Sequence, residues 1–148
     1  MADTIDVLLH FIEENWTQAR QHENQRATIS NLIIIIAAAL SGVVTQKGFK
    51  KDSLPLTVLL IILGVYGVIV TAKLYERSQY HLSRARELSC RLNELCPDAE
   101  IDKRITDANR GHDRSHKILS KLKRIWLGLP ILIVVLGITY TLIIILRP

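Results

Sequence analysis

The residues of this chain best suited to chemistry are its histidines and its two cysteines. His112 and His116 stand four residues apart, the spacing that two metal ligands on one helix require. Asp113, the nearest acid, points about 100° away around the helix. Three interpretations stay open: a metal site, ordinary histidines at a surface or helix interface, or a polar layer that sets register or senses pH. Cys90 and Cys96 match no zinc or redox spacing, and we expect reduced thiols between helices.

No enzyme motif accompanies these residues. The sequence has neither a glycine-rich phosphate loop nor a nucleophile elbow. Its most apolar segments contain no charged residue, which argues against a proton-coupled carrier. We therefore predict a protein that is not an enzyme, with no catalytic residue, no bound metal and no cofactor.

The elements that hold these residues are set by three long apolar runs. Ile29–Thr45, Pro55–Ala72 and Ile125–Leu146 contain no Asp, Glu, Lys or Arg, in a chain of 148 residues that is 49% apolar. One such run could be a buried helix of a soluble domain, but three leave too little polar chain to cover them. Each is long enough to span a bilayer with some tilt or help from flanking residues. We predict transmembrane helices at 29–45, 55–72 and 125–146, joined by an outer loop at 46–54.

The basic residues predict the orientation. Residues 1–28 and 73–124 lie on one side of the membrane and carry 15 of the 19 Lys and Arg residues, which indicates the cytoplasm. The N-terminus is then inside and the C-terminus outside, in a bacterial inner membrane. The same segments hold 13 of the 14 acids. The positive net charge is therefore no sign of nucleic-acid binding. Residues 1–28 lack the pattern of a cleaved signal peptide.

A heptad pattern continues the second span far beyond the lipid. Apolar and small residues recur in steps of four and three, which predicts one unbroken helix from about 55 to 95 with one side kept for neighbouring helices. The first helix shows the same steps and should run from about 4 to 45. After the second span, the residues of the heptad pattern are Leu74, Ser78, His81, Ala85, Leu88, Leu92 and Leu95.

A second heptad pattern runs from Ile101 toward the third span. Folding the chain at residues 96–98 matches the two patterns as an antiparallel hairpin, with apolar layers at both ends and a polar layer between them. The expected fold is therefore all-α, one domain over 1–148, in which three transmembrane helices continue into a cytoplasmic three-helix coiled-coil-like bundle. The expected polar layer is Ser78, His81, His112 and Ser115, and the expected packing residues are Leu88, Leu92, Ile101, Ile105, Gly64 and Gly67.

Small and weakly polar residues mark faces of the spans where helices can approach closely. One stripe on the first span is polar at both ends and small in the middle, and in a ring of subunits it could line a pore. Asn31 is its sharpest member, and a hydrogen bond between neighbouring helices is the alternative role for it. The pore-lining candidates are Thr28, Asn31, Ala38, Gly42 and Thr45, and the expected contacts to lipid headgroups are Lys73, Arg77, Lys121, Lys123 and Arg124.

This architecture resembles the small membrane effectors of bacterial anti-phage defence. The resemblance to the HalB-type partner of the Hailong system and to SLATT and RipA-like proteins lies in the helix entering the first span, from Trp16-Thr17-Gln18-Ala19-Arg20 through Arg26 and Asn31, and in the long hairpin between spans two and three. It implies a homo-oligomer released by a nucleotide or oligonucleotide signal or by a partner nucleotidyltransferase, which then depolarises or permeabilises the cell. It carries no invariant catalytic motif. The lack of an appended sensor domain suggests sensing at the helical stalk or through a partner.

Three functions compete at this point. The first is a homo-oligomeric effector whose cytoplasmic bundle gates an ion channel or pore. The second is a non-conducting scaffold whose stalk recruits a soluble partner. The third, a carrier or membrane enzyme, is least favoured because charged and catalytic groups are missing from the spans.

Overall fold

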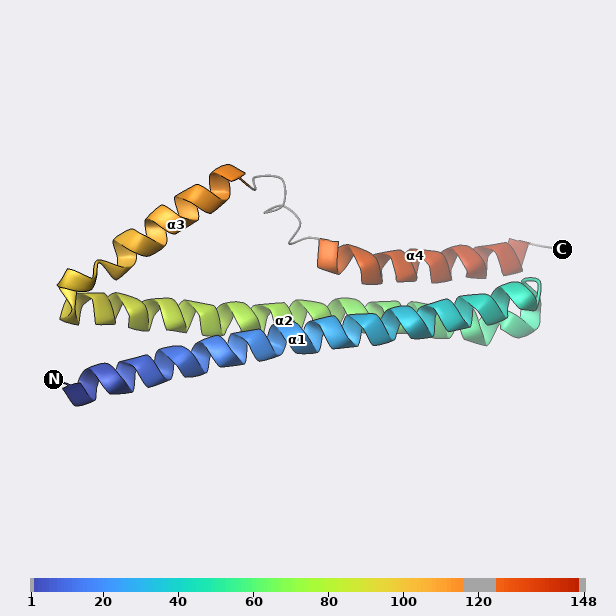
Figure 1. Cartoon of the computed structure of the whole chain (residues 1–148). Helices are drawn as coiled ribbons and strands as arrows, with labels where there is room; N and C mark the ends of the chain where they lie inside the picture. The colour runs from blue at the N-terminus through green and yellow to red at the C-terminus, as the bar shows by residue number, and fades with distance from the viewer. Residues whose placement is uncertain (1, 116–124, 147–148) are drawn as a thin grey trace. The chain divides into compact units, whose positions relative to one another are not determined.

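The computed structural model describes residues 2–115 and 125–146, with side chains described at 3–101, 103–110 and 126–146. Over these residues the chain is helical and contains no strand (Figure 1), so the predicted all-α class is confirmed. The elements are α1 (Ala2–Gln46), the 3-10 turn η1 (Lys51–Ser53), α2 (Leu54–Leu95), the 3-10 turn η2 (Pro97–Ala99), α3 (Ile101–Ser115) and α4 (Ile125–Leu146).

The bounds of the two long helices agree with the predicted ones. The helix expected over about 4–45 is α1, and the one expected over about 55–95 is α2. Between them the chain reverses through two consecutive residues with positive φ, Gly48 at 71° and Phe49 at 57°. Only glycine adopts this region without steric cost, which explains why Gly48 stands at the turn.

Among the residues that the structure describes, three helices are long and apolar enough to cross a membrane. The most apolar 18-residue windows of α1, α2 and α4 have mean hydropathies of 2.2, 2.5 and 2.8. Only 22%, 28% and 22% of these windows are buried within the chain. Large side chains such as Ile35, Ile69 and Leu132 are more than 60% exposed. Apolar surface on this scale is typical of helices that face lipid.

The chain divides into two compact units. We call Met1–Asn24 with Leu74–Lys123 the polar unit, and Gln25–Lys73 with Arg124–Pro148 the apolar unit. These bounds fall close to the predicted ends of the membrane spans. Helices α1 and α2 contribute to both units, whereas α3 belongs to the polar unit and α4 to the apolar unit.

The core of the apolar unit is built from α1, α2 and α4. Ile33 and Ala37 of α1 pack with Leu60 of α2 and Ile133 of α4, and none of the four is more than 8% exposed. Partly buried residues surround this core, among them Leu63 and Tyr140. Three helices therefore share one interior in this unit.

Burial along α2 follows one phase from end to end. The buried positions recur mostly in steps of three and four, the spacing of one helix face. Most of these residues are small or weakly polar, which allows close approach of neighbouring helices. They are Ser53 of the preceding turn, Thr57, Leu60, Gly64, Gly67, Thr71, Ser78, Ala85 and Leu92.

The structure does not show α3 as the third helix of a bundle. Ile101 is half-buried, but Ile105 is 48% exposed, and every described residue from 103 to 110 is exposed. Leu92 is buried, at 8% exposure, without the expected cover from Ile105. The physical reason is composition, because residues 101–110 offer only two isoleucines and one alanine for burial.

Candidate functional site

Close packing of α2 against α4 gives the apolar unit its frame. A Cβ atom added at Gly64 would lie 2.7 Å from Cγ2 and 2.8 Å from the backbone nitrogen of Val134. A Cβ added at Gly67 would lie 3.1 Å from Cβ of Pro130. Each glycine therefore lets one helix backbone approach the other, as in membrane helix pairs.

The same contact is repeated from the side of α4. A Cβ added at Gly137 would lie 2.7 Å from Cγ1 and 3.1 Å from the backbone nitrogen of Ile61. Next to it, Thr141 Oγ1 lies 2.9 Å from Thr57 Oγ1, and Thr57 Oγ1 lies 3.0 Å from the carbonyl oxygen of Leu54. Thr141 Oγ1 also lies 2.8 Å from the carbonyl oxygen of Gly137, so its single proton has two acceptors, one on its own helix and one on α2, while Thr57 donates to Leu54.

The stripe proposed to line a pore lies on the outside of the apolar unit. All five of its residues are exposed, in contrast to the glycines of the α2–α4 contact. A Cβ added at Gly42 would meet nothing within 4 Å. The Thr45 hydroxyl is satisfied by the carbonyl oxygen of Ser41 at 2.8 Å, whereas no hydrogen bond joins the Asn31 amide to the described residues. The five are Thr28, Asn31, Ala38, Gly42 and Thr45.

A groove runs between α1 and α4 beside this stripe. Its main part has a volume of about 570 Å³ and is lined by Ile34, Ala37, Ala38, Ser41, Leu129, Leu132, Ile133, Val135, Leu136 and Thr139. A smaller hollow of about 150 Å³ shares Ile34 and Leu129 with it and adds Ser30, Asn31 and Trp126. Both parts of this depression are lined mainly by apolar surface, and the smaller hollow adds one amide and one hydroxyl side chain.

The smaller hollow has a buried hydroxyl in its lining and a charged side chain next to it. Ser30 is 5% exposed, and its buried Oγ has no hydrogen-bond partner among the described residues. The guanidinium carbon of Arg26 lies 5.1 Å from the centroid of the Trp126 ring, within the range of a cation–π contact. A positive charge therefore lies over Trp126, one of the residues that line the smaller hollow.

In the polar unit, a buried polar layer joins α1 to α2. Asn15 of α1 is 5% exposed, and its Nδ2 donates to the carbonyl oxygen of Phe11 at 2.8 Å. Because this bond uses the amide nitrogen, Asn15 Oδ1 faces Nδ1 of His81 at 3.1 Å. That oxygen can only accept, so the proton of the neutral His81 ring lies on Nδ1.

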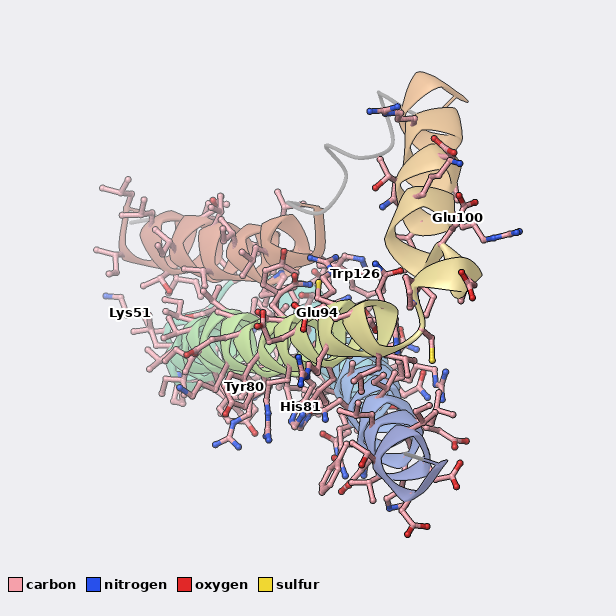
Figure 2. All side chains as sticks on the ribbon, turned by 90° about the vertical axis from the view of Figure 1, so that its left-hand side faces the viewer. Lys51, Tyr80, His81, Glu94, Glu100 and Trp126 are labelled. Atoms are coloured by element: carbon pink, nitrogen blue, oxygen red, sulfur yellow. The ribbon has the colours of Figure 1, made fainter. Side chains whose placement is uncertain are left out.

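A second histidine extends the layer. The rings of His22 and His81 are stacked with centroids 5.5 Å apart, and Tyr80 meets His81 edge-on at 5.5 Å. Figure 2 shows Tyr80 and His81 on α2. Burial, then the charges of His22, Arg84 and Arg77, lower the pKa of His81 below its usual value, against a smaller opposing effect of Glu14.

The described partners of His81 on a neighbouring helix come from α1. The predicted partners His112 and Ser115 have side chains outside the described ones, so their pairing with His81 stays a prediction. Ser78 is buried at 1% exposure, and its Oγ has no partner among the described residues. We call Asn15, His22, Ser78 and His81 the polar layer.

The remaining predicted residues divide into described and undescribed ones. Lys73 and Arg77 are exposed, as headgroup contacts require, while Lys121, Lys123 and Arg124 lie outside the described side chains. Leu88 is half-buried. In the part of the chain with described side chains, no group of three His, Cys, Asp or Glu residues could hold a metal. The His112–His116 pair lies outside that part.

Sequence reasoning missed Asn15, His22 and Ser30. Asn15 lies one position before Trp16 and outside the apolar phase of its helix, so periodicity gave no reason to bury it. Charge gave no signal either, because an amide and a hydroxyl are neutral. A polar residue flanked by helix-spaced apolar residues was the one available indication.

Comparison with known proteins returns no match. No protein-family model, no curated protein and no solved structure matches this chain. The function therefore has to be argued from the geometry of the two units.

Proposed function

We propose that the chain is a multi-pass protein of the bacterial inner membrane that assembles with copies of itself into an ion channel or pore. The observation that carries this proposal is the exposed stripe on α1. Asn31, Ala38 and Gly42 face outward, whereas Gly64, Gly67 and Gly137 lie in the contact between α2 and α4. A single copy would gain little from exposing this stripe to lipid, whereas copies arranged in a ring would place it on a weakly polar pore wall.

A large apolar residue lies next to the five residues of the stripe. Ile35 lies on the same side of α1 and is 64% exposed. In a ring of subunits it would form an apolar constriction between the polar ends at Asn31 and Thr45, and such constrictions close pores by dewetting. A pore of this kind would be shut at rest.

The polar unit supplies the means of control in this proposal. Its α1–α2 contact includes the polar groups of Asn15, His22 and His81. Both helices continue into the apolar unit, so a change in their contact can reach the pore helix α1. The resemblance to anti-phage effectors suggests a nucleotide or oligonucleotide signal or a partner nucleotidyltransferase as the trigger, with depolarisation as the outcome.

Electrical recording tests the channel. Induced expression should depolarise bacteria, and the purified protein should conduct in planar bilayers. Asn31→Leu should lower single-channel conductance by roughly twofold or more, because it removes the polar group at the cytoplasmic mouth. Thr139→Val is the matched control, since its exposed hydroxyl lies on α4 and bonds to Val135 of its own helix. Silent expression and an absence of current would contradict the channel.

A non-conducting scaffold is the second candidate. The exposed surface of α3, with Ile105 at 48% exposure, favours it because a soluble partner could cover that side. In that case Ile105→Asp would abolish partner capture, and Asn31→Leu would have no electrical effect.

A further inference from the structure

We propose that two surfaces of the polar unit join neighbouring copies of the chain. The α1 surface consists of Leu9, Glu13 and Trp16, and the α2 surface consists of Tyr80 and Arg84. The α1 surface of one copy lies against the α2 surface of the next. This proposal rests on the self-assembly proposed above and adds the residues through which the copies meet in the polar unit.

The α1 surface is apolar with an acid in its middle. Leu9 and Trp16 belong to the apolar phase of α1, yet both are more than 40% exposed. Glu13 lies between them at steps of four and three, so the three side chains share one side of the helix. The α1 part of the polar unit contains five acids and one Arg. An exposed apolar surface among acids fits a partner that is apolar and basic.

The α2 surface offers an aromatic ring and a positive charge. Tyr80 is 56% exposed, and the guanidinium carbon of Arg84 lies 5.6 Å from the centroid of its ring. Arg84 is also exposed and follows Tyr80 by four residues, so both side chains lie on one side of α2. Tyr80 can pack against Trp16 of another copy, and Arg84 can pair with the Glu13 carboxylate of that copy. The two surfaces are therefore complementary in apolar character and in charge.

The two surfaces lie at nearly the same height along the helices. His81 contacts both Asn15 and His22, so this part of α1 lies level with His81. Toward the N-terminus of α1, which is also the direction of the C-terminus of α2, Glu13 lies two residues beyond Asn15 and Arg84 lies three beyond His81. The difference is about 1.5 Å along the axis. Copies related by rotation about an axis parallel to the helices keep their heights, so Glu13 of one can meet Arg84 of the next.

The two surfaces point to opposite sides of the α1–α2 contact. Trp16 follows Asn15 by one residue, and Tyr80 precedes His81 by one. A helix turns about 100° per residue, and α1 and α2 run antiparallel, so these two steps lead to opposite sides. Contact between two unlike surfaces is heterologous and can repeat around a closed ring. This arrangement agrees with the ring of subunits proposed for the pore.

A tyrosine of the apolar unit favours a second copy over a soluble partner. Tyr66 lies two heptads before Tyr80 on the same side of α2 and is 54% exposed within the span predicted over 55–72. No hydrogen bond joins its hydroxyl to a described residue, and lipid chains offer no acceptor. A soluble acidic protein could reach Arg84 but not Tyr66. A second copy, embedded beside the first, can cover both.

Cysteine cross-linking between differently tagged copies tests the contact. In full-length chains with Cys90→Ser and Cys96→Ser, one copy carries Glu13→Cys and the other Arg84→Cys, and the two are co-expressed. We expect a short bismaleimide to join the two tags. Arg86→Cys is the matched control, because Arg86 is exposed, lies two residues beyond Arg84 and points about 200° away around the helix. No cross-link at Arg84→Cys, or an equal one at Arg86→Cys, would overturn the proposal.

Charge reversal tests the ion pair. Arg84→Glu should raise the dissociation constant between copies in mixed micelles by about fivefold, because it places like charges against each other. Glu13→Arg combined with Arg84→Glu should restore the parent value, whereas Arg86→Glu alone should leave it unchanged. Equal effects of Arg84→Glu and Arg86→Glu, or no recovery in the double variant, would contradict the pairing of Glu13 with Arg84.

Tyr66→Phe tests the occupant of the same side of α2 in the apolar unit. It keeps the ring and removes the hydroxyl, and it should raise the dissociation constant roughly threefold. An unchanged value would refute a second copy there. A monomeric parent protein would refute self-assembly and this contact together, whereas an oligomer without the Glu13–Arg84 cross-link would refute the contact alone. Intact cross-links without any current would refute only the channel.

Discussion

The two units use the same helix phase with different contents. In the apolar unit, α2 meets α4 through Gly64, Gly67 and Gly137 and buries Leu60 at 0% exposure. In the polar unit, the same side of α2 buries Ser78 and Ala85 and sets His81 against α1.

This difference shows how one continuous helix can make a closely packed contact in one unit and a contact that is sensitive to protonation in the other. Close backbone contact in lipid depends on small residues, because apolar side chains gain little by leaving an apolar solvent. In water the same small residues remove little apolar surface, so the α1–α2 contact of the polar unit has a weaker hydrophobic contribution. Protonation of the polar layer can then change the stability of the α1–α2 contact.

The largest effect should come from filling the α2–α4 contact. Gly64→Val should destabilise the protein by about 3 kcal/mol, because its Cβ meets the backbone of Val134, which cannot rotate away. Unfolding in mixed micelles, followed by circular dichroism, measures this change. Gly42→Ala is the control, since a Cβ there meets nothing within 4 Å. Equal stability of the two variants would show that the close contact is absent.

A charge placed at the end of the polar unit should have the next largest effect on stability. Leu92→Asp should cost roughly 2–3 kcal/mol, because it removes a buried apolar side chain and places a carboxylate on the buried side of α2. The exposed neighbour Arg91 gives the control, as Arg91→Asp leaves that side intact. Full helicity and unchanged unfolding of Leu92→Asp would refute packing on this side.

Acid should weaken the polar unit in a way that depends on His81. A histidine with a lowered pKa binds protons more readily in the unfolded chain, so stability is fully present above the unfolded value of 6.5 and falls as pH drops through 6.5 toward the folded pKa. Thermal unfolding at a series of pH values should show this fall, and His81→Gln should flatten it. His10→Gln, on an exposed histidine, should keep the parent profile.

The smallest effect should come from the threonine pair of the apolar unit. Thr141→Val should cost about 0.6 kcal/mol, the size of a hydrogen bond between membrane helices. Thr57 keeps its bond to Leu54, so no donor is left buried. Thr139→Val removes a hydroxyl that bonds only within its own helix and should cost less. A loss for Thr139→Val as large as that for Thr141→Val would show that the contact between the helices contributes nothing.

The sequence by itself determined the long helices and which side of α2 is buried. The lengths of α1 and α2, the three apolar spans and the phase through Gly64, Ser78 and Leu92 all follow from composition and spacing, because a helix repeats every 3.6 residues wherever it lies. Even the ends of the two units lie near the expected span ends, because the sequence changes there from apolar to charged residues.

The tertiary structure decided which helix lies against each buried side. Periodicity says that His81 faces a neighbour, but only packing shows that Asn15 of α1 lies against it. The same holds for Gly42 and Gly64, which look alike in sequence, yet one faces open space and the other meets Val134. The reason is physical: a helix fixes the direction of its own side chains, while its partner depends on the combined shape and chemistry of every helix that competes for that side.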